Sequence, residues 1–216
     1  MVKTTLWQDD YWLPLMQVYL KKPVGVKPVY SRDLVQLGME LHIAPQFLAE
    51  KMEQIARLDT PRLERIWQNY GENPRRLTRA VRLWREMRGF GAASEFYEGV
   101  ELNEGFERDF HPLDADKRLM PVSLILVLNL YFQLIPSTMV AMTPEVAQMA
   151  RLLGVPVDLV VEILRLYQHC DPYLNRKEQE KSALSEACHQ IWQRFADDTP
   201  EQLSAFAEQL VAYFQS

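Results

Sequence analysis

The sequence predicts an all-α fold, built as a tandem duplication of one five-helix module. Glycine is scarce, with 8 in 216 residues, and apolar residues recur at helical spacing with few β-branched runs. The segment 11–59 aligns without a gap on 123–171 when it is moved along by 112 positions. A hydrophobic content of 48% is enough for ordinary globular cores.

The matches between the two copies are spread along the whole aligned segment. The identical pairs are Tyr19/Tyr131, Gln36/Gln148, Leu41/Leu153, Glu50/Glu162 and Asp59/Asp171. Further on, Ile66-Trp67-Gln68 recurs as Ile191-Trp192-Gln193. We therefore expect a first helical module over residues 1–88, a linker over 89–122 and a second module over 123–216.

Five helices are predicted in each module, in the same order. Their expected starts, first module then second, are Asp10/Val122, Ser31/Thr143, Pro45/Pro156 and Pro74/Pro200, and the fourth helix carries Trp67/Trp192. The expected N-caps are Ser31, Thr143, Asn73 and Thr199, because Ser, Thr and Asn are preferred there, and proline suits the first helical turn. The extra residues 172–190 of the second copy are expected to lengthen its fourth helix. Both tryptophans are expected to be buried in the cores.

The charge is distributed unevenly along the chain. Residues 11–88 carry 14 Lys and Arg against 8 Asp and Glu, whereas residues 123–216 carry 6 against 11. The linker carries 3 against 8 and includes glutamates at every third position from Glu95 to Glu107. Its aromatic residues predict that it packs against the modules. The two modules therefore have related cores and different surfaces, as expected when their partners differ.

Residues 146–165, VAQMARLLGVPVDLVVEILR, resemble the helix-turn-helix superfamily. Ala150 stands where the two helices would cross closely, and Gly154 stands where the turn needs an unusual backbone conformation. Residues 34–53 resemble the same unit in a degenerate form, with His42 at the turn.

The resemblance implies that the third helix of a module enters the major groove of DNA. However, that helix carries Asp158 and Glu162 in the second copy, and a phosphate-binding surface should be basic. We therefore interpret both units as packing units rather than DNA readers.

The most specific chemical feature is the predicted helix 74–88. Its polar half consists almost entirely of arginines, which suit bidentate pairing with phosphate or carboxylate. The candidate anion- or partner-binding residues are Arg75, Arg76, Arg79, Arg82 and Arg85. Three interpretations stay open: a solvated face, a face neutralised by residues 95–116, and a face that binds a phosphate-bearing partner.

No catalytic motif, Gly-rich phosphate loop or metal-binding motif is present in the sequence. His169, Cys170, Cys188 and His189 flank the insertion, but adjacent helical residues point about 100° apart, which disfavours a shared zinc ion. We expect no catalytic residue, no cofactor and no metal. The two cysteines, and the absence of a signal-peptide pattern at the start, favour the cytoplasm.

These observations favour a non-enzymatic helical adaptor or regulator, with a protein as its partner. The alternative is a nucleic-acid-binding regulator that uses the arginine helix, with Arg62 and Arg65 flanking it. A membrane partner is not expected, since the most apolar stretch, Leu124 to Ile135, is too short to span a bilayer. Trp7, Tyr11 and Trp12 could cap a module or form a dimer contact, so the oligomeric state stays open.

Overall fold

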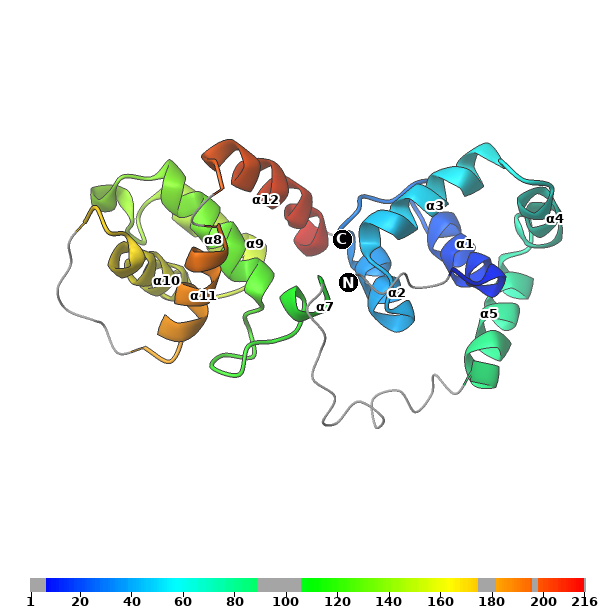
Figure 1. Cartoon of the computed structure of the whole chain (residues 1–216), viewed down its shortest axis with the longest axis horizontal. Coiled ribbons are helices and arrows are strands. Elements are labelled where there is room, and N and C mark those ends of the chain that lie inside the picture. The colour runs from blue at the N-terminus through cyan, green and yellow to red at the C-terminus, as the bar shows by residue number, and fades with distance from the viewer. Residues whose placement is uncertain (1–6, 89–105, 175–181, 196–197, 216) are drawn as a thin grey trace. The chain divides into compact units, whose positions relative to one another are not determined.

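The computed structural model describes residues 7–88, 106–174, 182–195 and 198–215. Every regular element in these ranges is helical and none is a strand, which confirms the all-α prediction for this part of the chain. The described residues form two compact units, one from 7 to 88 and one from 106 to 215 (Figure 1).

The first unit consists of five α-helices after one short 3-10 turn. The elements are η1 (Asp9–Tyr11), α1 (Trp12–Leu20), α2 (Arg32–Leu41), α3 (Pro45–Arg57), α4 (Pro61–Tyr70) and α5 (Pro74–Arg88). Helix α1 packs against α2, α3 and α5, so it lies at the centre of this core. Tyr11 and Trp12 are only 7% and 6% exposed, so these N-terminal aromatics cap their own unit.

The second unit begins earlier than the sequence predicts. Its elements are α7 (Phe106–Asp109), α8 (Pro121–Gln133), η3 (Pro136–Thr138), α9 (Pro144–Leu153), α10 (Val157–Cys170), α11 (Ser185–Phe195) and α12 (Pro200–Gln215). Residues 106–122, the last part of the predicted linker, pack in this unit, because Phe110 and Leu119 are buried and α7 contacts α8. The insertion does not lengthen α11, which has 11 residues against 10 in α4.

All four predicted N-cap residues directly precede their helices, but only two of them make a side-chain cap bond. Asn73 Oδ1 accepts a bond from the Arg76 N–H, and Thr199 Oγ1 accepts one from the Gln202 N–H, as predicted. Thr143 instead donates its hydroxyl to the Thr138 carbonyl, and Ser31 makes no side-chain cap bond. A preceding loop therefore competes with the helix end for the Thr143 hydroxyl.

The same turn joins the second and third main helices in each unit. His42 and Gly154 end α2 and α9 in the left-handed conformation, with φ of 56° and 68°. The next residue then bonds back across the turn: Ile43 N–H to Gly38 O and Val155 N–H to Ala150 O, both at 3.0 Å. Such bonds satisfy carbonyls that a helix end leaves free. Residues 146–165 thus form two helices rather than one.

One aromatic contact has the same form in both units. Tyr19 meets the edge of Trp67 at 6.1 Å and 76°, and Tyr131 meets Trp192 at 5.7 Å and 77°. Neither indole is fully buried, contrary to the prediction for Trp67 and Trp192; both are half-buried. Each lies at the margin of its core because its helix, α4 or α11, covers the bundle from the outside.

Candidate anion-binding face

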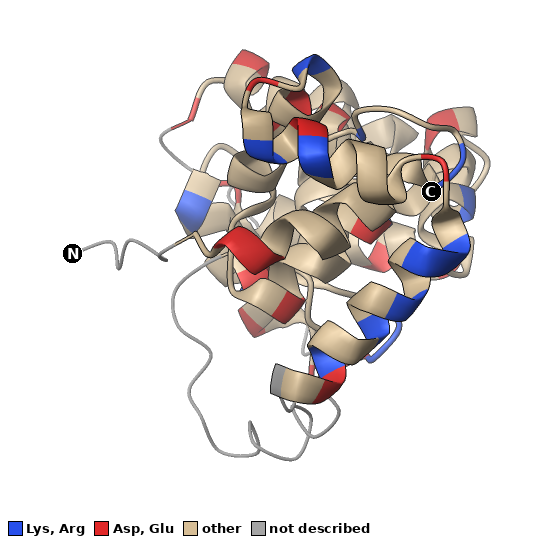
Figure 2. Ribbon diagram, turned by 90° about the vertical axis from the view of Figure 1, so that its right-hand side faces the viewer, with Lys and Arg blue, Asp and Glu red and all other residues tan. Residues whose placement is uncertain are grey.

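Helix α5 packs through an apolar side and exposes an arginine-rich side. Leu77, Val81 and Trp84 are at most 7% exposed and face the core, where α5 contacts α1 and α4. The exposed arginines are Arg75, Arg76, Arg79 and Arg82. Figure 2 shows the repeated blue bands that Lys and Arg residues produce in this region. We call this exposed side, residues 75, 76, 79 and 82, the arginine face.

The arginines at the two edges of the helix have neighbours within the first unit. Arg85 donates two hydrogen bonds to the carboxylate of Glu40 on α2, at 2.6 and 2.9 Å. Arg85 is therefore a structural clamp between α5 and α2, and it leaves the set of candidate binding residues. At the other edge, the Arg76 guanidinium lies 5.4 Å from the centre of the Tyr70 ring on α4.

The arginines in the middle of the face are largely unpaired. Arg82 lies 3.6 Å from Glu86, and both side chains are more than half exposed, so this pair is weak. Among the described residues, no carboxylate lies within 4.0 Å of Arg75 or Arg79. Since one helical turn rises about 5.4 Å, Arg75, Arg79 and Arg82 offer guanidinium groups over about 10 Å.

Two apolar side chains lie exposed beside these arginines. Helical periodicity places Leu83 and Met87 in the apolar half of α5, which is expected to be buried, but they are 45% and 87% exposed. Among the described residues of α5, only Leu77, Val81 and Trp84 are buried. Helices α1 and α4, which pack against α5, cover only part of its apolar surface. The arginine face therefore has an apolar margin, which helical periodicity alone does not reveal.

Residues 95–116, the segment that could neutralise the arginine face, lie only partly within the described residues. Residues 95–105 lie outside the described residues. Of residues 106–116, three acids pair inside the second unit: Asp109 with Arg194, Asp114 with Lys117 and Asp116 with Arg118, all at 2.6 Å.

Two of these contacts lower the pKa of the carboxyl group that takes part in them. The side-chain hydrogen bond from Arg118 lowers the pKa of Asp116 to about 2, and the bond from Lys117 lowers the pKa of Asp114. These acids are therefore already stabilised as carboxylates by their own neighbours.

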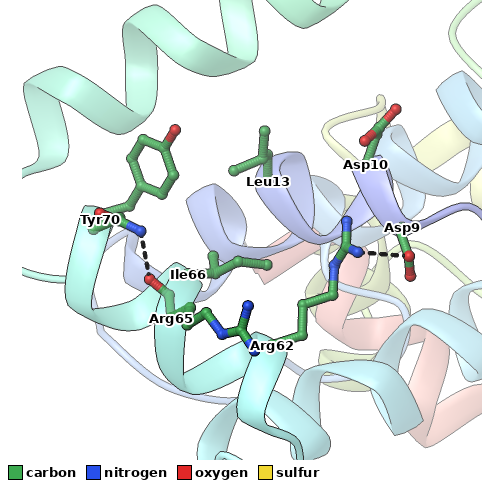
Figure 3. Close-up of a pocket in the computed structure, with 8 residues that line it drawn as sticks. Asp9, Asp10, Leu13, Arg62, Arg65, Ile66 and Tyr70 are labelled. Carbon is green, nitrogen blue, oxygen red and sulfur yellow. Dashed lines mark hydrogen bonds and ion pairs between the residues drawn. The ribbon is translucent and has the colours of Figure 1, made fainter.

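An open hollow of about 300 Å³ lies close to Tyr70, between η1, α1 and α4. In Figure 3, Arg62 reaches toward Asp9, with which it forms an ion pair of 2.7 Å. Arg65, the second flanking arginine of the prediction, also lines the hollow. Both thus lie on α4, the helix whose Tyr70 contacts Arg76 of α5.

The helices that a DNA-binding unit would insert into a groove are poorly suited to it. Helix α10 packs against α8, α9 and α11 and buries residues along most of its length. On α3, the exposed polar residues include Glu50 and Glu53. In α3, Lys51 and Arg57 only balance these two glutamates. A largely buried helix and a helix without net positive charge are both poorly suited to contact with phosphates.

The cysteine and histidine residues of the second unit do not form a metal site in the described structure. No three of the described His, Cys, Asp and Glu residues are grouped so that they could hold an ion. Cys170 and Cys188 are free thiols. Burial, with smaller effects from Cys170 and Glu162, raises the pKa of Cys188 to about 12.

We expect Cys188 to resist alkylation in the folded protein, because only the thiolate reacts. Iodoacetamide at mildly alkaline pH, followed by mass spectrometry, should label Cys188 only after denaturation. The raised pKa of the folded state also means that the contribution of this thiol to stability is complete below about pH 9, and is lost as the pH rises toward 12. Labelling of Cys188 at the rate of an unfolded cysteine would contradict this.

Comparison with known families, characterised proteins and solved structures gives no match to this chain. Among the described helices, none combines the length and the apolar character that spanning a membrane requires. The site must therefore be interpreted from its own geometry.

Proposed function

We propose that this chain is a non-enzymatic cytoplasmic adaptor, made of two copies of a helix-turn-helix-like five-helix module. In this proposal, the first module binds an acidic protein partner through the arginine face of α5. The observation that carries it is the combination of unpaired Arg75 and Arg79 with exposed Leu83 and Met87 on one helix.

Residues at equivalent positions of the two units are buried to the same extent, which supports the duplication. Leu34 and Val146 are both 0% exposed, as are Leu48 and Val160. The helix contacts also correspond, because α1 with α5 matches α8 with α12, and α2 with α3 matches α9 with α10. The left-handed turns at His42 and Gly154 add a backbone feature that apolar periodicity alone would not produce.

Helices α5 and α12 share the same packing position but carry opposite charges on their exposed sides. Leu77 and Leu203 are both 2% exposed and occupy equivalent positions. Aligned on these leucines, Arg75 corresponds to Glu201, and Arg82 to Glu208, and both acids are exposed. Since the same packing tolerates the opposite charge at these two positions, Arg75 and Arg82 are not needed for the fold, which favours a role in binding.

The apolar margin favours a protein partner over nucleic acid. Leu83 and Met87 can be covered by apolar side chains of a partner helix, whereas a phosphate backbone offers no such surface. Arginine pairs with carboxylates in a planar, two-bond geometry. An amphipathic helix with acids one turn apart would therefore match both the charge and the apolar strip.

Nucleic acid is the second candidate, favoured by the four exposed arginines of α5. Binding of this kind would depend steeply on salt, with a slope of about −0.9 in log K against log salt for each phosphate neutralised on duplex DNA. It should not depend on Leu83 or Met87.

A binding titration distinguishes the two candidates. The probes are an acidic amphipathic peptide helix with a leucine stripe, duplex DNA and structured RNA, each at two salt concentrations. The variants are Arg75→Gln/Arg79→Gln/Arg82→Gln and Leu83→Ser/Met87→Ser. The matched control, Arg57→Gln/Arg151→Gln/Arg165→Gln, removes the same charge at other exposed positions.

We expect the peptide to bind and the arginine variant to weaken it about tenfold, the sum of three exposed pairs. The leucine–methionine variant should weaken it as well, and the control should leave it unchanged. Binding of DNA or RNA that the arginine variant abolishes and the apolar variant leaves intact would replace the protein partner with nucleic acid. No binding of any probe at low salt would eliminate both candidates.

A further inference from the structure

Three aromatic rings surround one ammonium group in the first unit. The Nζ atom of Lys51 lies 5.6 Å from the ring centres of Trp7 and Trp12, and 5.3 Å from that of Phe47. All three distances lie within the roughly 6 Å over which a cation is attracted to a ring face. We call Trp7, Trp12 and Phe47 the aromatic cage.

The rings are held in place largely by contacts among themselves. Trp7 meets Trp12 edge-on with ring centres 4.8 Å apart, and it meets Tyr11 edge-on with ring centres 5.6 Å apart. Phe47 lies 5.9 Å from Trp7 and belongs to α3, one turn before Lys51. The cage is therefore formed by residues that would stay near one another if the Lys51 side chain moved away.

Lys51 is held in the cage by few other contacts. Among the described residues, its only polar contact is a hydrogen bond of 3.4 Å to Gln54 Oε1, and no carboxylate lies within 4.0 Å of its Nζ. The primary ammonium is strongly hydrated and sits on a flexible four-carbon stem. Moving it into water therefore breaks only one weak hydrogen bond besides the ring contacts.

We propose that the aromatic cage is a binding site for a quaternary ammonium group, and that Lys51 is an internal occupant that such a ligand replaces. A fully alkylated ammonium is larger and more weakly hydrated than that of lysine, so it gains more from the same three rings. Phe47 is 36% exposed and forms the open wall of the site. The ligand is either a trimethylated lysine of a protein or a small free quaternary ammonium compound such as choline.

A second observation is an unsatisfied hydrogen-bond donor in the Trp7 wall of the cage. The indole N–H of Trp7 is buried and has no hydrogen-bond partner among the described residues. A buried donor without a partner costs stability, so the packing of Trp7 is less favourable than its ring contacts suggest. The proposal does not depend on the arginine face, because it involves α1, α3 and the segment before η1.

The test follows the indole N–H signals of the full-length chain by NMR during titration. Tetramethylammonium, choline and the capped amino acid trimethyllysine are the probes, with sodium chloride as the ionic control. Lys51→Met removes the internal cation and keeps an apolar stem, and Lys51→Gln is a second version in case the first does not fold. Trp7→Leu and Phe47→Ser each remove one wall, and Lys22→Met is the matched charge control at an exposed lysine.

We expect saturable shifts of the Trp7 signal, with binding about tenfold tighter in the Lys51 variants and unchanged in Lys22→Met. Trp7→Leu and Phe47→Ser should lose binding. Tighter binding of trimethyllysine than of choline would assign the site to a modified protein, and the reverse order to a small free quaternary ammonium compound. Shifts no larger than those caused by sodium chloride, or binding that survives the loss of both walls, would overturn the proposal.

Discussion

Replacing Tyr167 with alanine is expected to lower the free energy of unfolding of the second unit by about 3–5 kcal/mol. The side chain is 0% exposed, and its hydroxyl donates a hydrogen bond of 2.9 Å to the Leu124 carbonyl on α8. Burial raises the pKa of this hydroxyl well above its usual value, so it stays protonated as a donor. The truncation removes a ring from the contact between α8 and α10 and leaves a cavity.

The matched control for this substitution is Tyr167→Phe. It keeps the ring and removes only the hydrogen bond, so we expect a loss of about 1 kcal/mol. Urea unfolding followed by far-UV circular dichroism measures both variants. If alanine were no more harmful than phenylalanine, the ring would not be a core element of the second unit.

Replacing Met52 with alanine is expected to destabilise the first unit by about 2–5 kcal/mol. Met52 is 0% exposed on α3, and its sulfur accepts a hydrogen bond of 3.2 Å from the Lys27 N–H in the loop before α2. The substitution therefore creates a cavity and also frees this loop.

Met52→Leu serves as the control, because it keeps most of the volume and removes only the sulfur acceptor. Such a volume-conserving change should cost less than about 1.5 kcal/mol. Thermal unfolding measures the global effect, and amide hydrogen exchange at Lys27 measures the loop. We expect faster exchange at Lys27 in both variants, and a lower melting temperature mainly in Met52→Ala. Unchanged exchange would show that the sulfur contact does not hold the loop.

Helix positions in this chain are largely predictable from sequence, because they depend on local signals. The periodic apolar residues of α2, such as Leu34, and of α3, such as Leu48, predict these two helices to within a few residues. Proline marks the start of α3. Gly154 marked its turn because few other residues adopt a left-handed backbone without strain. The duplication and the helix-turn-helix relationship remain predictions.

Features that depend on neighbours distant in the sequence could not be predicted. The exposure of Leu83 and Met87 depends on how much of α5 is covered by α1 and α4. Arg85 belonged to the arginine pattern, but Glu40, on a different helix, makes it structural. The cage around Lys51 forms only after the chain folds, because periodicity does not reveal which lysine meets Trp7 and Trp12.

The uneven distribution of tryptophan gives the chain a built-in optical label. Four of the five tryptophans, at positions 7, 12, 67 and 84, belong to the first unit, and Trp192 alone belongs to the second. Their fluorescence therefore reports mainly on the first unit. In a Trp192→Phe chain it would report on the first unit alone, while circular dichroism follows both. A difference between the two signals during denaturation would then resolve the order in which the units unfold, without cutting the chain.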